Sequence, residues 1–398
     1  MKTQVPFSFY LAIACGFVAC GCNSSGGSGA GGTSSSGGSN AGGSNAGGAA
    51  TGGASRTGGS NAGGSNAGGT ATGGASGTGG STGSGTTPPS CPSSGPGISD
   101  CGASGESCCT SVKVPGGTFY RTYANDGSGA QNTADPATIS DFRLDKYLVT
   151  VGRFRKFVTA WDQGDGYTPA AGSGKHMHLN NGKGLADSGA PGTYEAGWLE
   201  EYGKNLTMLN DSLDCDSSAS AWTTTSGANE KLPMNCVNWF EVYAFCIWDG
   251  GFLPSEAEYT YAAAGGTEQR QYPWGADAPG TTNQYAIYGC NYPDGAGSGN
   301  CKDIAHIAPV GFAQRGAGKW GHLDLVGNLQ EWLLDYFSGS YANPCTDCAN
   351  LASGSGRAPR DGYFEDMKQT NLLSSYRNNG FYPANRFYSY GFRCARAP

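Results

Sequence analysis

The sequence predicts one α+β domain with a low content of regular secondary structure, preceded by a long N-terminal segment that has none. Beyond residue 112, short segments with strand or helix periodicity alternate with long Gly-rich loops. Roughly 290 residues remain after the Gly-rich segment, enough for one large hydrophobic core. Twelve of the 15 cysteines follow residue 90, and an even number in an exported chain favours disulfide bonds.

Residues 1–22 have the pattern of a bacterial lipoprotein signal peptide. A charged N-terminus is followed by an apolar run at 5–19, which is too short for a stable membrane span. Small residues precede Cys20, so we expect Cys20 to carry the lipid, with Cys22 as the alternative. Cleavage by an ordinary signal peptidase is the competing interpretation. The pattern predicts an exported lipoprotein at the bacterial outer membrane or cell surface, attached to the membrane through its lipid.

Residues 23–90 consist almost entirely of Gly, Ser, Ala, Thr and Asn, with Arg56 as their one charge. Such a segment cannot bury enough apolar surface to offset its ordering entropy, so we expect a disordered linker. As a flexible coil it would reach on the order of 45 Å. A Cys-rich lead-in at 91–111 then precedes the globular domain at 112–398. The organisation is that of a domain on a tether.

The charged and metal-ligating residues exclude several function classes. The formal charge is −7 and no basic stripe is present, which argues against nucleic acid as a partner. Four histidines are too few, and too isolated in sequence, to indicate a metal-hydrolase cluster or a nucleophile triad. His176 and His178 are the one close pair, and we expect them to be exposed on a loop and inert.

The first elements of the domain are two strands, at 114–120 and 142–149, of which the second alternates apolar and polar residues. Thr150 can cap a helix whose apolar residues recur at helical spacing over 151–161. The polar, Gly-rich stretch that follows predicts a long loop with one helix near 194–213.

Two helices are expected in the middle of the domain. Residues 238–249 read as an amphipathic helix, in which Asn238 and Glu241 have the spacing of a capping box. Ser255 can cap a second helix that begins with Glu256 and Glu258. Carboxylates near a helix start gain from the helix dipole, so these two glutamates need no catalytic role.

The Gly321–Trp332 loop brings oxygen ligands close together in sequence. Asp324 and Glu331 supply carboxylates, and the carbonyls of Gly327 and Leu329 could join them around a calcium ion, which takes six to eight oxygens. The alternative is a buried turn in which the acids accept hydrogen bonds from backbone N–H groups. Spacing alone leaves both interpretations open.

This loop resembles the G-L-x-D-x-x-G-N-x-x-E-W signature of the formylglycine-generating enzyme family, whose domains are also called sulfatase-modifying factor domains. Three other segments agree with that family in the same order: 114–119, 232–275 and 391–395. The similarity covers residues 112–398, and four motifs in order are specific. It implies the formylglycine-generating-enzyme fold, a C-type-lectin-like α+β scaffold.

The resemblance also implies particular bonds and ligands. Family members bind calcium at positions matching Asp324, Gly327, Leu329 and Glu331, and they join the positions matching Cys246 and Cys394 by a disulfide. A second family disulfide is missing, since its positions match Ala263 and one near Ser374. An Arg that is common in relatives is replaced by Phe252. We further expect the local disulfides Cys215–Cys236, Cys290–Cys301 and Cys345–Cys348.

The family's catalytic centre has no counterpart here. Its enzymes use O₂ to oxidise a sulfatase cysteine to formylglycine, at a Cu(I) site made by two cysteines five residues apart; soft thiolates suit that ion. Counting back from Gly391 places those positions near Phe364 and Gln369, and no cysteine lies between Cys348 and Cys394. We therefore expect no copper. An oxidase that uses other residues is the alternative.

Residues 378–390 are rich in aromatic, Asn and Arg side chains, which suit recognition of a protein or a glycan. We take Tyr382, Asn385, Arg386 and Tyr388 as the ligand-binding residues. The competing interpretation is that several of these aromatics belong to the core. Two functions thus remain, a non-catalytic binding module and a formylglycine-generating oxidase.

Overall fold

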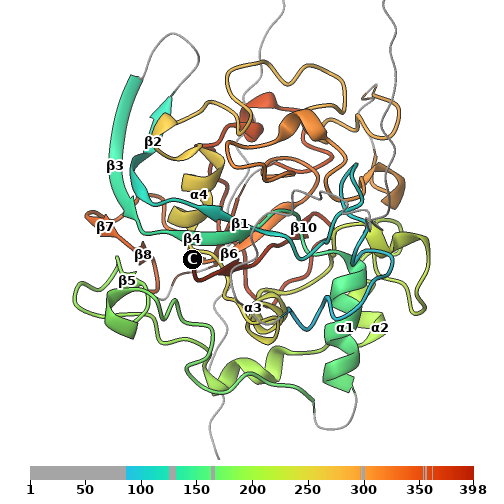
Figure 1. Cartoon of the computed structure of the whole chain (residues 1–398), viewed down its shortest axis with the longest axis horizontal. Coiled ribbons are helices and arrows are strands. Elements are labelled where there is room, and N and C mark those ends of the chain that lie inside the picture. Colours follow the sequence, from blue (N-terminus) through green and yellow to red (C-terminus); the bar gives the residue numbers. More distant parts are fainter. Residues whose placement is uncertain are drawn as a thin grey trace, which may run out of the picture. The chain divides into compact units, whose positions relative to one another are not determined.

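The structure is a computed structural model. It describes residues 87–124, 131–162, 166–295, 297, 301–352, 354, 356–360 and 362–398. The expected signal peptide 1–22, with Cys20, and nearly all of the expected linker 23–90 lie outside the described residues. Helices and short strands in the described part are joined by long irregular segments, as Figure 1 shows. None of its helices has the length and apolar character needed to cross a membrane.

The domain begins and ends in one sheet. Strand β1 (Ser111–Val114) runs antiparallel to β4 (Phe142–Asp145), and β4 pairs on its other side with β11 (Ala395–Arg396), also antiparallel. In Figure 1 the C-terminus accordingly lies beside β4. The strand expected over 142–149 stops at Asp145. Val149 instead donates its N–H to the carbonyl of Phe392.

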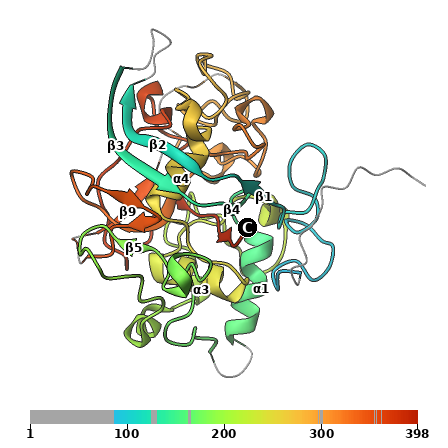
Figure 2. The same cartoon turned by 60° about the vertical axis from the view of Figure 1, so that its left-hand side comes forward.

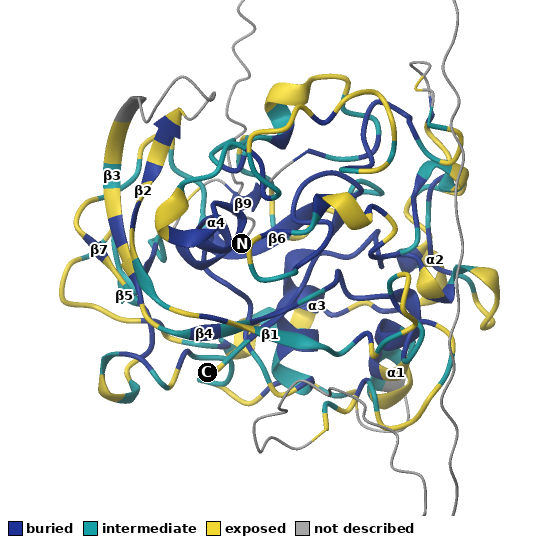
Figure 3. Ribbon diagram, turned by 45° about the horizontal axis from the view of Figure 1, so that its top comes forward, coloured by how far each residue is buried: buried dark blue, intermediate teal, exposed yellow. Residues whose placement is uncertain are grey.

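A long hairpin lies next in the chain. Strand β2 (Gly117–Ala124) pairs antiparallel with β3 (Gln131–Ile139). On its other side β3 pairs in parallel with β7 (Cys345–Thr346). Buried and exposed residues alternate along β2, as the two colours in Figure 3 show. The sequence did not predict β3, because its residues are mostly polar and include Pro136, which normally argues against a strand.

The central strand is β6 (Gln330–Tyr336), whose first three residues are the last three of the Gly321–Trp332 loop. It lies between β10 (Tyr390–Gly391), in parallel, and β9 (Arg357–Arg360), antiparallel. Six of its seven residues are buried. A further small parallel pair joins β5 (Ala186–Asp187) to β8 (Cys348–Ala349).

The α-helices of the described residues are α1 (Val151–Asp162), α2 (Asn210–Leu213), α3 (Trp239–Trp248) and α4 (Glu256–Ala263). The helices expected at 151–161 and 238–249 are therefore confirmed, and so is the helix after Ser255. The helix expected near 194–213 is wrong except for α2 and a 3₁₀ turn, Glu200–Asn205.

Both predicted capping boxes are present. Asn238 Oδ1 accepts the N–H of Glu241 at 3.0 Å, and Glu241 Oε2 accepts the N–H of Asn238 at 3.1 Å. At α4, Ser255 Oγ accepts the N–H of Glu258 at 3.2 Å, and Glu258 Oε2 accepts the N–H of Ser255 at 2.8 Å. Each glutamate thus satisfies a backbone donor that the helix leaves free.

The expectation that α3 is amphipathic is wrong, because every residue from Trp239 to Cys246 is buried. The long loop that precedes α3 in the chain covers the helix face that was expected to be exposed to solvent. Trp198 lies 5.7 Å from Tyr243, and Tyr202 lies 5.7 Å from Trp239, between ring centroids. Figure 2 shows this green and yellow-green segment beside α3.

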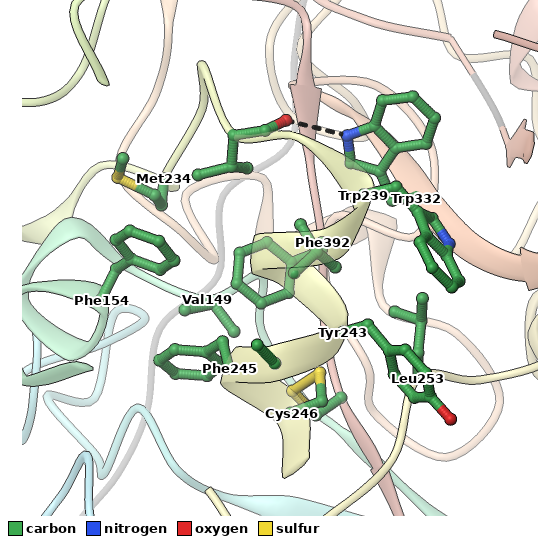
Figure 4. Close-up of a cluster of buried hydrophobic side chains, with 14 of the residues drawn as sticks. Val149, Phe154, Met234, Trp239, Tyr243, Phe245, Cys246, Leu253, Trp332 and Phe392 are labelled. Carbon is green, nitrogen blue, oxygen red and sulfur yellow. Dashed lines mark hydrogen bonds between the residues drawn. A yellow bond between two sulfur atoms is a disulfide. The ribbon is translucent and has the colours of Figure 1, made fainter. Parts of the chain in front are cut away.

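The main core surrounds α3, as the sticks in Figure 4 show. Phe245 stacks on Phe154 of α1, with ring centroids 5.7 Å apart, and meets Phe392 edge to face at 5.3 Å. Trp332 of β6 donates its Nε1–H to the carbonyl of Val237 at 3.1 Å. The core therefore joins the Gly321–Trp332 loop and the 391–395 segment to α3.

Six disulfides join all twelve cysteines of the described residues. The bond between Cys246 and Cys394 ties α3 to the last strand, as the resemblance implied, and the three expected local pairs are also present. Cys91–Cys109 and Cys101–Cys108 complete the set. The lead-in at 91–111 packs on the domain, since Cys101 and Cys108 share a buried cluster with Tyr147.

Candidate functional site

The positions that match the family's copper cysteines are occupied by side chains of a different kind. Phe364 is fully buried, in a cluster with Leu329. Gln369 is exposed and donates its Nε2–H to the hydroxyl of Tyr288 at 3.2 Å. Ser374 Oγ donates to the carbonyl of Ala263 at 3.1 Å. The two positions that match the missing family disulfide, Ala263 and Ser374, are thus neighbours. Their contact supports the match of Phe364 and Gln369 to the copper cysteines.

No residue set in the described part fits a thiolate-bound copper ion. Cu(I) takes soft thiolate ligands, and every cysteine there is already in a disulfide. Cys345 and Cys348, the one C-x-x-C pair, are bonded to each other. Nor do three His, Cys, Asp or Glu side chains of those residues gather as a metal site.

In the Gly321–Trp332 loop, Glu331 has a complete set of protein partners. Its Oε1 lies 2.7 Å from Arg393 Nη2, and its Oε2 lies 2.8 Å from Arg393 Nε. The hydroxyl of Tyr259 donates to Oε1 at 2.8 Å. Arg393 and Glu331 are both buried. A guanidinium therefore already supplies the charge that a cation would bring to this carboxylate.

Asp324 is placed at a backbone turn, with φ of 54°. Its Oδ2 accepts the N–H of Gly311, while its carbonyl accepts a bond from Arg393 Nη2 at 2.8 Å. Burial raises the pKa of Asp324 to about 6. Asp324 Oδ2 and both carboxylate oxygens of Glu331 thus already have protein donors, which a calcium ion would have to displace.

The four expected ligand-binding residues divide into two kinds. Tyr382, with 66% of its surface exposed, and Asn385 lie open to solvent. Arg386 instead forms an ion pair with buried Glu241, its Nη1 lying 2.6 Å from Glu241 Oε2. The Tyr388 hydroxyl donates to Glu365 at 3.0 Å. Arg386 and Tyr388 therefore hold the segment in place, and the other two side chains are the accessible ones.

The sequence missed a buried charge cluster around His176. Its Nδ1 lies 3.0 Å from Glu195 Oε2 and its Nε2 lies 3.1 Å from Glu258 Oε2. The expectation that His176 and His178 are an exposed pair is wrong, because the His176 ring packs on Phe252 with centroids 3.8 Å apart and is fully buried. His178 is half-buried and stacks on the same ring.

The two carboxylates keep His176 charged. Burial alone would lower the pKa of His176, but Glu258 and Glu195 raise it to about 10. Burial alone would raise the pKa of Glu258, but the His176 cation holds that pKa below its ordinary value. His176 thus supplies a buried positive charge beside Phe252, the position at which the family resemblance implies an arginine. A long-range contact from an irregular loop leaves no local pattern that could have predicted it.

Fold and site together define a disulfide-bonded scaffold with buried ion pairs and, among the described residues, no free thiol. The sequence model of the sulfatase-modifying factor enzyme 1-like domain matches residues 100–398. The chain belongs to this family, and its α+β fold is the one that the sequence predicted. The match begins within the Cys-rich lead-in.

Similar proteins include formylglycine-generating enzymes and relatives that carry "inactive" in their names. The formylglycine-generating enzyme of Streptomyces coelicolor is 28% identical over 308 residues, covering 71% of this chain and 88% of that protein. The inactive C-alpha-formylglycine-generating enzyme 2 of Bos taurus is 29% identical, over 57% of this chain and 70% of its own length. Among solved structures, PvdO from Pseudomonas aeruginosa has a TM-score of 0.44 at 19% identity, covering 72% of this chain and 94% of that one.

Proposed function

We propose that this protein is an exported, lipid-anchored binding module on the formylglycine-generating enzyme scaffold, without oxidase activity, and that its ligand is a protein or a glycan. The occupancy of the copper positions carries the proposal. A buried phenylalanine and an exposed glutamine stand there, and all cysteines of the described residues are in disulfides. A family relative that carries "inactive" in its name makes loss of activity on this scaffold plausible.

The binding surface that we propose is the 378–390 segment, with Tyr382 and Asn385 as its contact residues. Tyr382 is the most exposed large hydrophobic side chain of the described residues. The ion pair of Arg386 with Glu241 fixes the backbone beside it. A rigid loop that presents an aromatic side chain loses little conformational entropy on binding.

Export and anchoring rest on the sequence pattern around Cys20 and on the disulfides. Six disulfides suit an oxidising compartment outside the cytoplasm. Labelling with a radioactive or clickable fatty acid tests the anchor. Incorporation that disappears in Cys20→Ser supports it, and incorporation that survives in Cys20→Ser but not in Cys22→Ser moves the lipid to the alternative cysteine.

The activity is tested by incubating the full chain with a C-x-P-x-R peptide, O₂ and Cu(I), alongside the Streptomyces coelicolor enzyme as a positive control. We expect the control to form the aldehyde and this protein to form none. Aldehyde formation by this protein would instead support the oxidase alternative. A glycan and peptide array, read with the wild-type chain and Tyr382→Ala, then tests the binding role. Loss of the signal in the variant places the ligand on the proposed surface.

A further inference from the structure

Arg357 of β9 is a buried cation held between two aromatic rings. Its guanidinium carbon lies 3.7 Å from the ring centroid of Trp239 and 3.6 Å from that of Tyr336. Arg357 is 3% exposed, and its Nη1 donates to the carbonyl of Leu334 at 2.6 Å. Because the rings cover both faces of the guanidinium, a further partner can reach only its edge.

Unlike Arg153, Arg360 and Arg393, which are also buried, Arg357 has no acidic partner. Arg153, Arg360 and Arg393 each lie within 4.0 Å of a carboxylate. No carboxylate of the described residues lies that close to Arg357, and its Nε is buried without a hydrogen-bond acceptor. Burial lowers the pKa of Arg357. A buried charge without a counter-ion is costly, and buried charges in proteins are normally paired.

A hollow of about 220 Å³ lies beside this guanidinium. Its lining includes Arg357, Glu195 and the aromatic residues Tyr202, Trp239 and Tyr243. The Glu195 carboxylate faces the His176 cation, with Oε2 at 3.0 Å from Nδ1. Glu195 is therefore already paired, and Arg357 is the uncompensated charge of the hollow.

We propose that this hollow binds the carboxylate of a small organic ligand, with the edge of the Arg357 guanidinium as its counter-charge. A planar carboxylate matches the guanidinium fork. The volume is below the usual 300–1,000 Å³ of drug-sized pockets, so a ligand the size of a single acidic sugar or amino acid fits best. Both sources present the same group, and separate probes distinguish them.

The inference rests on the proposed binding function and deepens it, because the hollow adjoins the proposed surface. Arg357 and Phe381 exchange backbone hydrogen bonds at 2.8 and 3.0 Å, and Trp239 donates its N–H to the carbonyl of Pro383 at 2.9 Å. Two walls of the hollow are thus bonded to the residues on either side of Tyr382. A ligand at Tyr382 could place a carboxylate here.

The test titrates the full chain with glucuronate and with N-acetylglutamate, using glucose and N-acetylglutamine as matched neutral probes. Calorimetry gives the affinity, and the indole N–H resonance of Trp239 reports the place. We expect one of the two acids to bind at least tenfold tighter than its neutral partner and to shift that resonance. Which acid binds identifies the source as an acidic sugar or an acidic amino acid.

Two variants of Arg357 show whether carboxylate binding depends on the hydrogen-bonding edge of the guanidinium or only on a positive charge. Arg357→Met should weaken carboxylate binding at least tenfold. Arg357→Lys, which keeps the charge without the fork, should weaken it less. Arg155→Met is the matched control, since Arg155 also stacks on a tryptophan, at 4.3 Å from Trp222, in a different hollow of about 350 Å³. This control should bind as the wild type does.

Equal affinity for acids and neutral probes, or undiminished binding by Arg357→Met, would overturn the inference. If Arg357→Met does not fold, the Trp239 resonance of the wild type decides: an acid that binds without shifting it binds elsewhere. Array binding that depends on Tyr382, with no acid preference, leaves the binding function standing and removes the inference alone. If an acid binds at Arg357 but the glycan and peptide array shows no binding, the carboxylate site stands and the proposed binding surface at Tyr382 loses its support.

Discussion

His176 Nε2 lies 3.1 Å from Glu258 Oε2, inside the core and at the start of α4. The same glutamate closes the capping box of that helix through Ser255. One carboxylate therefore joins the helix start to a loop about 80 residues earlier in the chain.

Replacing His176 by Gln should destabilise the protein by about 3–5 kcal/mol near pH 6, because it leaves Glu195 and Glu258 buried without a cation. The folded-state pKa of His176 is raised from 6.5 to about 10. Its contribution is thus fully present below pH 6.5 and is lost as the pH rises toward 10. Urea unfolding of wild type and variant from pH 5 to 10 measures this, and the difference between them should shrink over that range.

His178→Gln is the matched control, since neither ring nitrogen of His178 has a hydrogen-bond partner among the described residues. It should change the free energy of unfolding much less than His176→Gln and show no comparable loss above pH 6.5. A difference between wild type and His176→Gln that stays constant from pH 6 to 10 would contradict the ion-pair explanation.

The double variant His176→Gln/Phe252→Arg tests whether the histidine takes the place of the arginine that the family resemblance implies at position 252. Phe252 packs directly on the His176 ring, so an arginine there has Glu258 within reach. We expect it to restore at least half of the lost stability and to remove the pH dependence above 6.5, because arginine does not titrate there. Unfolding curves at pH 6 and pH 9 suffice. A double variant no more stable than His176→Gln would rule out the replacement.

Removing the Cys246–Cys394 disulfide with a double Ala substitution should cost about 4–5 kcal/mol in the chain-entropy model, because the bond spans 148 residues. Removing Cys345–Cys348, which spans 3 residues, should cost about 2 kcal/mol in that model. Urea unfolding of both double variants measures the difference. Equal losses would show that native-state packing, rather than loop length, sets the effect.

The elements that the sequence predicted are those whose signals are local. The capping boxes at Asn238 and Ser255 fix where α3 and α4 begin, and both are present. The Cys246–Cys394 disulfide was predicted from the family resemblance, because the spacing of the cysteines alone does not indicate it. By contrast, strand β3 is held by pairing with β2 despite its polar residues, so no local pattern marks it.

The charge cluster could not be predicted for a related reason. His176 is followed by an exposed methionine and lies in an irregular polar stretch, which alone indicates a solvent-exposed loop. Its burial depends on Phe252, and its charge on Glu195 and Glu258. The unpaired state of Arg357 is equally invisible in sequence, because it depends on the absence of nearby acids in three dimensions.

Arg386→Ala should lower the free energy of unfolding by about 3 kcal/mol, because Glu241 is fully buried and would lose its counter-ion. Tyr382→Ala and Asn385→Ala should stay within about 0.5 kcal/mol of wild type, as exposed substitutions do. Urea unfolding of the three variants tests this division. Loss of ligand binding in Tyr382→Ala is then a binding effect, whereas loss in Arg386→Ala is not. A Tyr382→Ala variant that unfolds would remove the main support for the binding surface.

The family resemblance implies a calcium site at the Gly321–Trp332 loop, but in the structure the counter-ion of Glu331 is Arg393. Because the guanidinium already neutralises this carboxylate, we expect the melting temperature of the wild type to be the same in millimolar calcium and in excess chelator. Glu331→Gln should cost about 3–5 kcal/mol in either buffer, since it leaves buried Arg393 without its counter-ion. Asp324→Asn is the companion variant and should likewise respond equally in the two buffers. A wild-type melting temperature that falls on chelation, with the fall absent in Asp324→Asn, would show that calcium binds here and that Glu331 exchanges Arg393 for the cation.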